Sequence, residues 1–447
     1  MTNDFAVCHY IYNMKRRRDI FTGIELASDK IRVVVASFQD QEQDLSKPDS
    51  PLVIRGFAEV PSLKMLKDEP VTPNIVAEQV SQALTAAWNM AACEGLPGVL
   101  ALVLSGNYIR PHFVKASVQL DEHEAISEED YESAMRATYS EVENLQGDDD
   151  NQEVIPLPLV NHGFRLADGR MVFNPVGQYS STLTAESCCF VADVTRHEQV
   201  EAMIRDAMGG YQLDYVVYAP IAVASGVLQP TLSDEPQGLV IDLGAGMTSF
   251  AIPTKIGFVA CEQLAVGMDH LANDLAIALT LEIGTARQIV EQLAQLRCTV
   301  VATHDGNARM VNVTEPGLNR RQRSFSADAI ESILEVRLRE LFQLVKNRLD
   351  EQGVYPWIGN EILLTGVGAV LPRVTELAAQ IFNRRVRMAL PYRVTGRPDF
   401  VLGPQHSTVL GLLRCACVEE RLRVAQEAAN DGGLLKKLKS FVDVMGW

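Results

Sequence analysis

The clearest indication of the fold is Ile241-Asp242-Leu243-Gly244-Ala245-Gly246-Met247-Thr248, a glycine-rich turn between two predicted strands, residues 239–243 and 250–252. Glycines let the backbone turn tightly and bring its N–H groups within reach of phosphate oxygens. The Thr248 hydroxyl can donate a hydrogen bond, and the Asp242 carboxylate can hold a metal ion through water. The pattern indicates a phosphate-binding loop, and a glycine-rich hairpin with an incidental aspartate is the alternative interpretation.

Two further turns of small residues follow predicted strands. Ser28-Asp29-Lys30 connects predicted strands 21–26 and 31–38, and Ser28 and Lys30 are placed to reach the β- and γ-phosphates of a nucleotide. Leu363-Leu364-Thr365-Gly366-Val367-Gly368-Ala369-Val370 follows an apolar strand, and its two glycines let the chain pass close under an adenosine. Each of these two turns alone is weak support, but three turns in the order phosphate, phosphate, adenosine predict a nucleotide cleft.

The chain is organised as two similar halves. Its 447 residues exceed one ordinary hydrophobic core, and 47% apolar with 22% charged residues is the composition of a globular protein. Each half opens with a strand, a short turn and a second strand, and strands then alternate with helices. This predicts an α/β fold of two lobes with the cleft between them. The other predicted strands are 99–105, 187–193, 215–218 and 362–365; the predicted helices are 73–93, 197–208, 221–228, 268–281, 286–296 and 327–350, with one more from about 371 and a helix start capped by Ser127 and Asp130.

Composition argues against several function classes. A net charge of -17 opposes nucleic-acid binding, because phosphate contacts need clustered Lys and Arg. The eight cysteines form no CxxC pair, so neither a disulfide framework nor a zinc site is indicated. No Ser-His-Asp or Cys-His order is present, and we predict no catalytic residue. The histidines show no ligand spacing: His9, His112, His123, His162, His197, His270, His304 and His406.

Over residues 20–416 the sequence resembles the actin, Hsp70 and sugar-kinase superfamily, and within it the bacterial cell-division family FtsA. The resemblance rests on the three turns and on four further stretches: Ile126-Ser127-Glu128-Glu129-Asp130, residues 177–181, Ala219-Pro220-Ile221-Ala222-Val223-Ala224-Ser225-Gly226, and Val266-Gly267-Met268-Asp269-His270-Leu271-Ala272-Asn273-Asp274-Leu275-Ala276. It implies a two-lobed actin-like (ribonuclease H-like) fold in which subdomain 1C replaces the 1B subdomain of actin. The implied division is 1–19 extension, 20–104 and 181–228 subdomain 1A, 105–180 subdomain 1C, 237–267 and 329–417 subdomain 2A, 268–328 subdomain 2B, 418–433 linker and 434–447 terminal helix.

The resemblance also implies ligands and partners. ATP with magnesium is expected in the cleft, the magnesium held by Asp242 through water. Subdomain 2B is expected to bind the C-terminal peptide of FtsZ, subdomain 1C to contact later division proteins, and copies of the chain to form filaments. The implied nucleotide-binding residues are Ser28, Asp29, Lys30, Asp242, Gly244, Ala245, Gly246, Met247, Thr248, Gly267, Gly366, Val367 and Gly368.

Four residues depart from the family pattern. The first phosphate loop has Glu25 and Ala27 where the family has Asp and Gly, and the second has Ala245 where Gly is common. Ala219 stands where many ATPases of the superfamily place a Gln or Glu that orients the attacking water. We therefore expect weak nucleotide binding, and weak or absent hydrolysis.

The last fourteen residues have the pattern of a helix that lies in a membrane interface. Helical spacing places an apolar stripe on one side, and lysines flank it and can snorkel to the lipid headgroups. The alternative is a helix docked on the protein's own body or on that of a partner. The residues predicted to contact anionic lipids are Leu434, Leu435, Lys436, Lys437, Leu438, Lys439, Phe441, Val442, Met445 and Trp447.

No apolar run of about 18 residues exists, and the N-terminus lacks the order of a signal peptide. We expect a peripheral protein on the cytoplasmic side of the inner membrane, at the division septum, with translation starting at Met14. A PilM-like pilus-assembly protein is the alternative and would need no terminal helix. An actin-fold metabolite kinase, which would need a carboxylate in the cleft, and an Hsp70-type chaperone fit less well.

Overall fold

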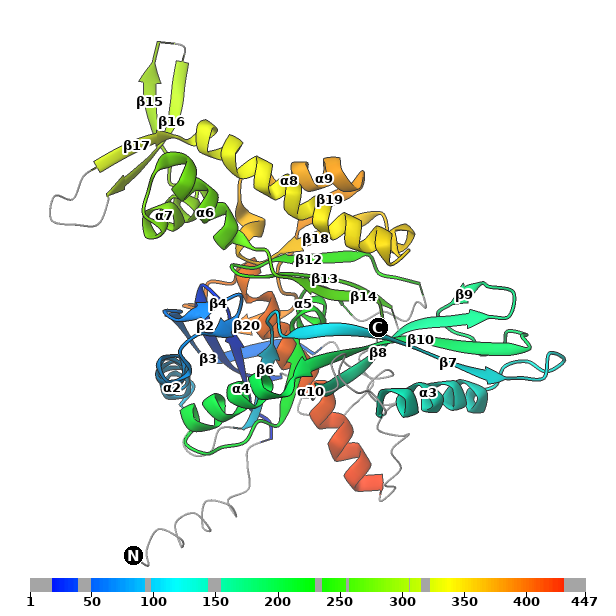
Figure 1. The fold of residues 1–447 in the computed structure, drawn as a ribbon. Helices are drawn as coiled ribbons and strands as arrows, with labels where there is room; N and C mark the ends of the chain where they lie inside the picture. Colours follow the sequence, from blue (N-terminus) through cyan, green and yellow to red (C-terminus); the bar gives the residue numbers. More distant parts are fainter. Residues whose placement is uncertain are drawn as a thin grey trace, which may run out of the picture.

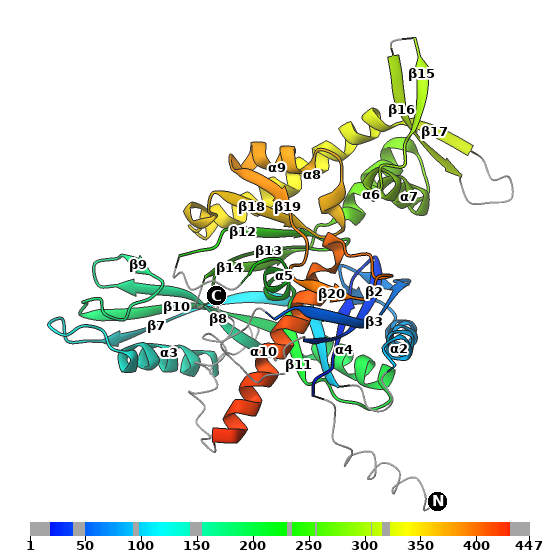
Figure 2. The same cartoon turned by 180° about the vertical axis from the view of Figure 1, so that it is seen from behind.

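The computed structural model describes residues 18–38, 50–92, 98–143, 154–229, 235–254, 257–304, 306–314 and 322–429. Two lobes, each built on a central sheet, lie one above the other, and two smaller units project from them (Figures 1 and 2). The predicted α/β two-lobed organisation is confirmed. Residues 1–17 with Met14, and the predicted terminal helix 434–447, lie outside the described residues.

The first lobe contains a six-stranded sheet of order β11-β6-β1-β2-β3-β20. Helices α2 and α4 cover one face, and α10 packs on the other, so both faces are buried. This explains the nearly continuous apolar runs of the central strands. The elements are β1 (Phe21–Leu26), β2 (Lys30–Phe38), β3 (Leu52–Pro61), β6 (Val99–Leu104), β11 (Tyr215–Tyr218), β20 (Val394–Gly396), α2 (Pro73–Met90), α4 (Val194–Ala207), α5 (Ala219–Val227) and α10 (Ser407–Ala429).

The second lobe contains a five-stranded sheet of order β14-β13-β12-β18-β19, which shares one apolar core with α8. Helices α6 and α7 and a three-stranded sheet of order β15-β16-β17 project from this lobe (Figure 1). The elements are β12 (Leu239–Leu243), β13 (Thr248–Thr254), β14 (Gly257–Leu264), β18 (Glu361–Thr365), β19 (Arg385–Met388), α8 (Ala327–Glu351), α9 (Val374–Phe382), α6 (Met268–Leu279), α7 (Ile283–Ala294), β15 (Thr299–Thr303), β16 (Gly306–Thr314) and β17 (Gln322–Ser326).

A four-stranded sheet with helix α3 (Glu128–Glu143) occupies the region predicted as an insertion. The capped start of α3 is confirmed, since Ser127 Oγ donates to Asp130 Oδ2 at 2.7 Å and accepts from the Asp130 N–H at 3.2 Å. The sheet runs past the predicted boundary at residue 180, because its central strand ends at Asp193. Its strands are β7 (Ile109–Gln119), β8 (Val154–Leu166), β9 (Met171–Val172) and β10 (Thr182–Asp193), in the order β7-β10-β8-β9.

Helix α10 crosses the predicted boundary between the second lobe and the linker without a break. Val418 and Glu420, predicted to lie in the linker, are buried, and Glu420 accepts hydrogen bonds from Arg18 at 3.1 Å and from the Tyr215 hydroxyl at 2.8 Å. Residues 418–429, predicted as part of a linker, continue helix α10. The first lobe supplies the polar partners of Glu420.

Helices α5 and α10 cross at very close range. Gly226 of α5 faces the Ser407 carbonyl, and Gly411 of α10 faces the Ala222 carbonyl, with no room for a methyl group at either glycine. Small residues allow two helix backbones to approach until they touch. Among the described helices, none is long and apolar enough to cross a membrane.

Candidate functional site

The three predicted turns meet in one cleft between the lobes. Strands β1 and β6 run parallel, as do β12 and β18, so the carboxyl ends of each pair face the same way. Of the predicted nucleotide-binding residues, seven line this cleft: Asp29, Asp242, Gly244, Ala245, Met247, Gly366 and Val367. The remaining lining residues are Glu25, Leu26, Ala27, Arg32, Asp68, Val103, Ser105, Ala219, Ser249, Gln263, Gln405 and Thr408.

The first turn is fully engaged by other parts of the chain. The Ser28 N–H and the Ser28 hydroxyl both donate to Asp68 Oδ1 at 2.8 Å. Asp29 pairs with the Arg32 guanidinium, and Lys30 Nζ pairs with Glu59 Oε2 at 2.7 Å. Each group predicted to contact phosphate therefore already has a partner within the protein.

The second turn packs directly against the first. A methyl group at Gly246 would overlap Ser28 Oγ and would lie 2.9 Å from the Lys67 Cα. Thr248, predicted as a phosphate donor, is completely buried and donates instead to the Val266 carbonyl at 2.7 Å. Its hydroxyl therefore stabilises the turn.

The second turn also supplies hydrogen-bond acceptors for the first N–H groups of helix α6. The N–H groups of Met268 and Asp269 donate to the carbonyls of Gly244 and Ala245 at 3.0 and 2.8 Å. A side chain at Gly267 would overlap the Ala245 carbonyl. Gly267 is thus required for the close packing of α6 on the turn.

At one position of the third turn the backbone conformation requires glycine. Gly366 has φ +84°, a left-handed conformation, and any Cβ here would overlap Asp242 Oδ1. Gly368 packs against the Met268 thioether and Leu243. The backbone does make a close approach at this turn, but the group that it approaches is the Asp242 carboxylate of the protein itself.

A cluster of carboxylates around one arginine dominates the electrostatics of the cleft. Arg32 is only 2% exposed and lies 3.5 Å from carboxylate oxygens of both Glu25 and Glu59, in addition to its Asp29 pair. Burial disfavours its charge, but these three carboxylates outweigh burial and raise the pKa of Arg32. A charged residue in the apolar run 31–36 was the sequence signal for this cation, and it was missed.

Burial also raises the pKa of three acids in the cleft. It raises the pKa of Glu25 to about 8 and that of Asp242 to about 7, and it raises the pKa of Asp68. A hydrogen bond from His406 holds the pKa of Glu59 below its usual range. At neutral pH the Glu25 carboxyl therefore keeps its proton, beside the buried ion pairs of Arg32.

The closed cleft does not fit ATP with magnesium. Its free space of about 30 Å³ holds one or two waters, whereas pockets for small ligands measure about 300–1,000 Å³. Among the described residues, Asp29 Oδ1 is a buried carboxylate oxygen without a hydrogen-bond partner, and such an acceptor repels phosphate. Within the part of the chain that the structure describes, no group of three or more His, Cys, Asp or Glu side chains could hold a metal ion.

Glu25→Gln is expected to flatten the pH dependence of stability. Glu25, which faces Arg32, Asp242, Asp29 and Asp68, keeps its proton in the folded state up to about pH 8, whereas the unfolded chain releases it near pH 4.5. The stability that this proton contributes is complete below about pH 4.5 and is lost as the pH rises to about 8. The slope of unfolding free energy against pH should change by about 1.4 kcal/mol per pH unit in this window.

Urea unfolding at pH 5, 6, 7 and 8 measures the effect of Glu25→Gln. Glu122→Gln, at a side chain that is 67% exposed, is the control and should keep the wild-type slope. Equal slopes for Glu25→Gln and the wild type would show that Glu25 is ionised in the folded protein.

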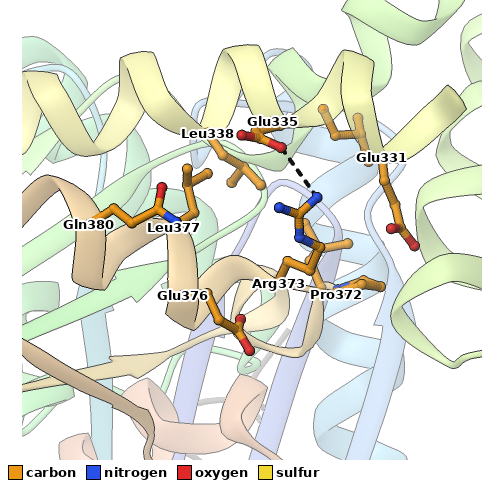
Figure 3. A pocket seen from close by; sticks show the side chains of 10 residues that line it. Glu331, Glu335, Leu338, Pro372, Arg373, Glu376, Leu377 and Gln380 are labelled. Carbon is orange, nitrogen blue, oxygen red and sulfur yellow. Dashed lines mark ion pairs between the residues drawn. The ribbon is translucent and has the colours of Figure 1, made fainter. Parts of the chain in front are cut away.

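A second hollow lies between α8 and α9. Its walls combine leucines with glutamates, and Arg373 lies 3.5 Å from Glu335 across it (Figure 3). It falls outside the predicted partner-binding range 268–328. The lining residues are Glu331, Leu334, Glu335, Leu338, Leu371, Pro372, Arg373, Glu376, Leu377 and Gln380.

Comparison with known proteins agrees with this architecture. A family model described as "Cell division protein FtsA" matches residues 239–411, the segment from β12 into α10. The chain is 26% identical over 395 residues to the cell division protein FtsA of Pseudomonas aeruginosa, covering 88% of each protein. It is 25% identical over 444 residues to that of Escherichia coli (strain K12), covering 95% of this chain and 98% of that protein.

Among solved structures, a PilM-PilN type IV pilus biogenesis complex is similar with a TM-score of 0.59. The match covers 90% of this chain and 99% of that chain at 15% identity, a likeness of fold alone. The sequence relationship, in contrast, runs through nearly the whole length of the division proteins. The chain is therefore similar to cell division proteins FtsA over nearly its whole length, and it has a mixed α/β, actin-like fold.

Proposed function

We propose that this protein tethers an FtsZ polymer to the cytoplasmic face of the inner membrane at the division septum. In this role the unit around residues 268–328 binds the C-terminal peptide of FtsZ, copies of the chain associate into filaments, and residues 105–180 contact later division proteins. The observation that carries the proposal is a group of exposed apolar side chains on α6, α7, β15 and the turn between α7 and β15. They are Ile277, Ile283, Leu296, Val300 and Val301, between 42% and 72% exposed.

These five side chains, here called the 2B patch, suit a docking surface. Exposed apolar residues scattered singly need no explanation, but five within twenty-five residues on one projecting unit favour a protein partner. Every residue of β15 is exposed, and β15 is an edge strand, so an extended peptide can also pair with its backbone. The unit projects away from the cleft, where a partner can reach it (Figures 1 and 2).

The proposed membrane contact is made by residues 434–447. Six half-buried apolar side chains contribute roughly 1 kcal/mol each, and each lysine near an anionic leaflet about 1 kcal/mol more. Ordering the helix offsets part of this gain, so one copy binds reversibly and a row of copies binds firmly. Helix α10 extends beyond the first lobe in both views, and it precedes this segment in the sequence (Figures 1 and 2).

We further propose that ATP with magnesium binds weakly in an opened form of the cleft. The three turns supply glycines and carboxylates of the expected kind, but the lobes must separate before a nucleotide can enter. Hydrolysis is proposed to be weak or absent, because Ala219 lines the cleft and cannot orient an attacking water.

Co-sedimentation of FtsZ with anionic liposomes tests the tethering function. The intact chain should pellet with liposomes and bring FtsZ with it, and a chain truncated after Asn430 should leave both in the supernatant. Ile277→Glu should still pellet but should bind FtsZ at least about tenfold more weakly, a loss of about 1.4 kcal/mol.

Val336→Glu is the matched control, because Val336 is 71% exposed and Ile277 is 72% exposed, and Val336 lies on α8 outside the 2B patch. This variant should behave as the wild type. Equal loss of FtsZ by both variants would rule out the 2B patch. Failure of the intact chain to pellet would favour a PilM-like role, which needs no membrane helix.

A further inference from the structure

The Asp68 side chain sits in a cradle of hydrogen-bond donors at the first turn of the cleft. Asp68 Oδ1 accepts from the Ser28 N–H and the Ser28 hydroxyl, each at 2.8 Å, and Asp68 Oδ2 accepts from the Ser105 hydroxyl at 2.8 Å. A backbone N–H and two hydroxyls that converge on one group are the donors with which proteins bind phosphate and other anions. The carboxylate thus fills an anion cradle.

The hairpin that carries Asp68 is short and strained. Strands β4 (Met65–Leu66) and β5 (Glu69–Pro70) are joined by Lys67 and Asp68, with φ +50° and +59°. A two-residue turn with both φ values positive favours Asn, Asp or Gly, and a lysine in this conformation is unfavourable. The contacts of Asp68 offset this cost, because Ser28 Oγ also accepts from the Asp68 N–H at 2.9 Å.

The cradle is connected to the second lobe. The Ser105 hydroxyl, which donates to Asp68, accepts from Gln263 Nε2 at 2.9 Å, and the same Gln263 amide donates to the Ser249 hydroxyl at 3.0 Å. Gln263 lies on β14 and Ser249 on β13. A chain of hydrogen bonds therefore links the Asp68 carboxylate across the cleft to the sheet of the second lobe.

We propose that Asp68 is a built-in anion that occupies the phosphate cradle, helps to hold the lobes closed, and is displaced when a polyphosphate enters. The inference rests on the proposed nucleotide binding and adds a regulatory device to it. A phosphate group and the Asp68 carboxylate compete for the same donors, so the affinity for nucleotide is set in part by the cost of moving the hairpin.

The hairpin has space into which it can move. A hollow of about 330 Å³ lies beside β4 and β5, between them and helix α4. Its lining includes Lys67 and Glu69 of the hairpin and Arg196 of α4, which pairs with Glu69 at 3.2 Å. Movement of Asp68 away from Ser28 therefore requires little displacement of packed side chains.

Three variants separate the effect of the carboxylate from that of the hairpin. Asp68→Asn keeps the shape and tolerates a positive φ, but it removes the charge. Asp68→Ala removes the occupant altogether. Glu122→Gln removes one charge from an exposed side chain that does not line the cleft and is the matched control. Each full-length variant is titrated by calorimetry with ATP and magnesium and, separately, with inorganic tripolyphosphate.

Asp68→Asn and Asp68→Ala are both expected to bind tripolyphosphate and ATP at least tenfold more tightly than the wild type, with Glu122→Gln unchanged. Equal affinities in the wild type and the Asp68 variants, or no binding of tripolyphosphate by any of them, would overturn the inference. Tighter binding of tripolyphosphate without binding of ATP would support the cradle and reject the proposed nucleotide function.

Discussion

Arg32→Ala is expected to lower the free energy of unfolding by about 3–5 kcal/mol, the cost of leaving buried charges without their partner. Arg32 is 2% exposed and pairs with Asp29 and Glu59, and it lies 3.5 Å from Glu25. Alanine would remove the cation and leave the Asp29 and Glu59 carboxylates without it in a closed cleft.

Chemical denaturation of both proteins at pH 7.5 measures this change. Arg170→Ala is the control, since Arg170 and its partner Asp168 have side chains that are 59% and 53% exposed. Its unfolding midpoint should stay at the wild-type value. A loss for Arg32→Ala that is as small as that of the control would mean that solvent reaches the cluster and screens its charges.

Gly411→Ala is expected to cost about 3 kcal/mol, the upper part of the range for overpacking a well-packed core. The added methyl would overlap the Ala222 carbonyl, which belongs to the backbone of α5 and cannot rotate away. The helices would have to separate along their contact, and α10 would then lift from the first sheet.

Thermal unfolding of Gly411→Ala should be compared with that of Gly284→Ala. Gly284 lies in α7 with nothing within 4 Å of the position a Cβ would take. Alanine there should be neutral or stabilising by up to about 1 kcal/mol, because alanine has the higher helix propensity. Similar effects at the two glycines would show that the α5–α10 crossing tolerates a wider spacing.

Local patterns in the sequence predicted much of the fold. Strands 21–26, 215–218 and 239–243 are confirmed with the same bounds, and the helix predicted at 327–350 is α8, Ala327–Glu351. These segments carry their signal within a few residues, as apolar runs between turns or as a stripe at helical spacing.

Strand β8 was missed because its sequence contains two prolines, which normally argue against a strand. The 407–417 part of α10 was missed as well, since it is buried on all sides and shows no apolar stripe. Its burial between the first sheet and α5 removes the contrast between faces on which such predictions depend.

The cleft was predicted in outline, but its chemistry was not. Asp29, Asp242 and Gly366 lie together as the three turns implied. The occupant of the Ser28 cradle is Asp68, forty residues further along the chain, and it comes from a two-residue turn without any motif. Partners at such separations depend on the tertiary fold, so short-range spacing cannot reveal them.

Helix α10 is long enough to amplify a small rotation at the cleft. Its first turn touches the cleft, where the Thr408 hydroxyl lies 3.3 Å from Asp242 Oδ2, and its far end precedes the proposed membrane segment in the sequence. At 1.5 Å per residue, its 23 residues form a rod about 35 Å long, so a tilt of about 10° at the cleft displaces the far end by about 6 Å. A small change of tilt at the cleft is therefore amplified into a larger displacement at the far end of α10.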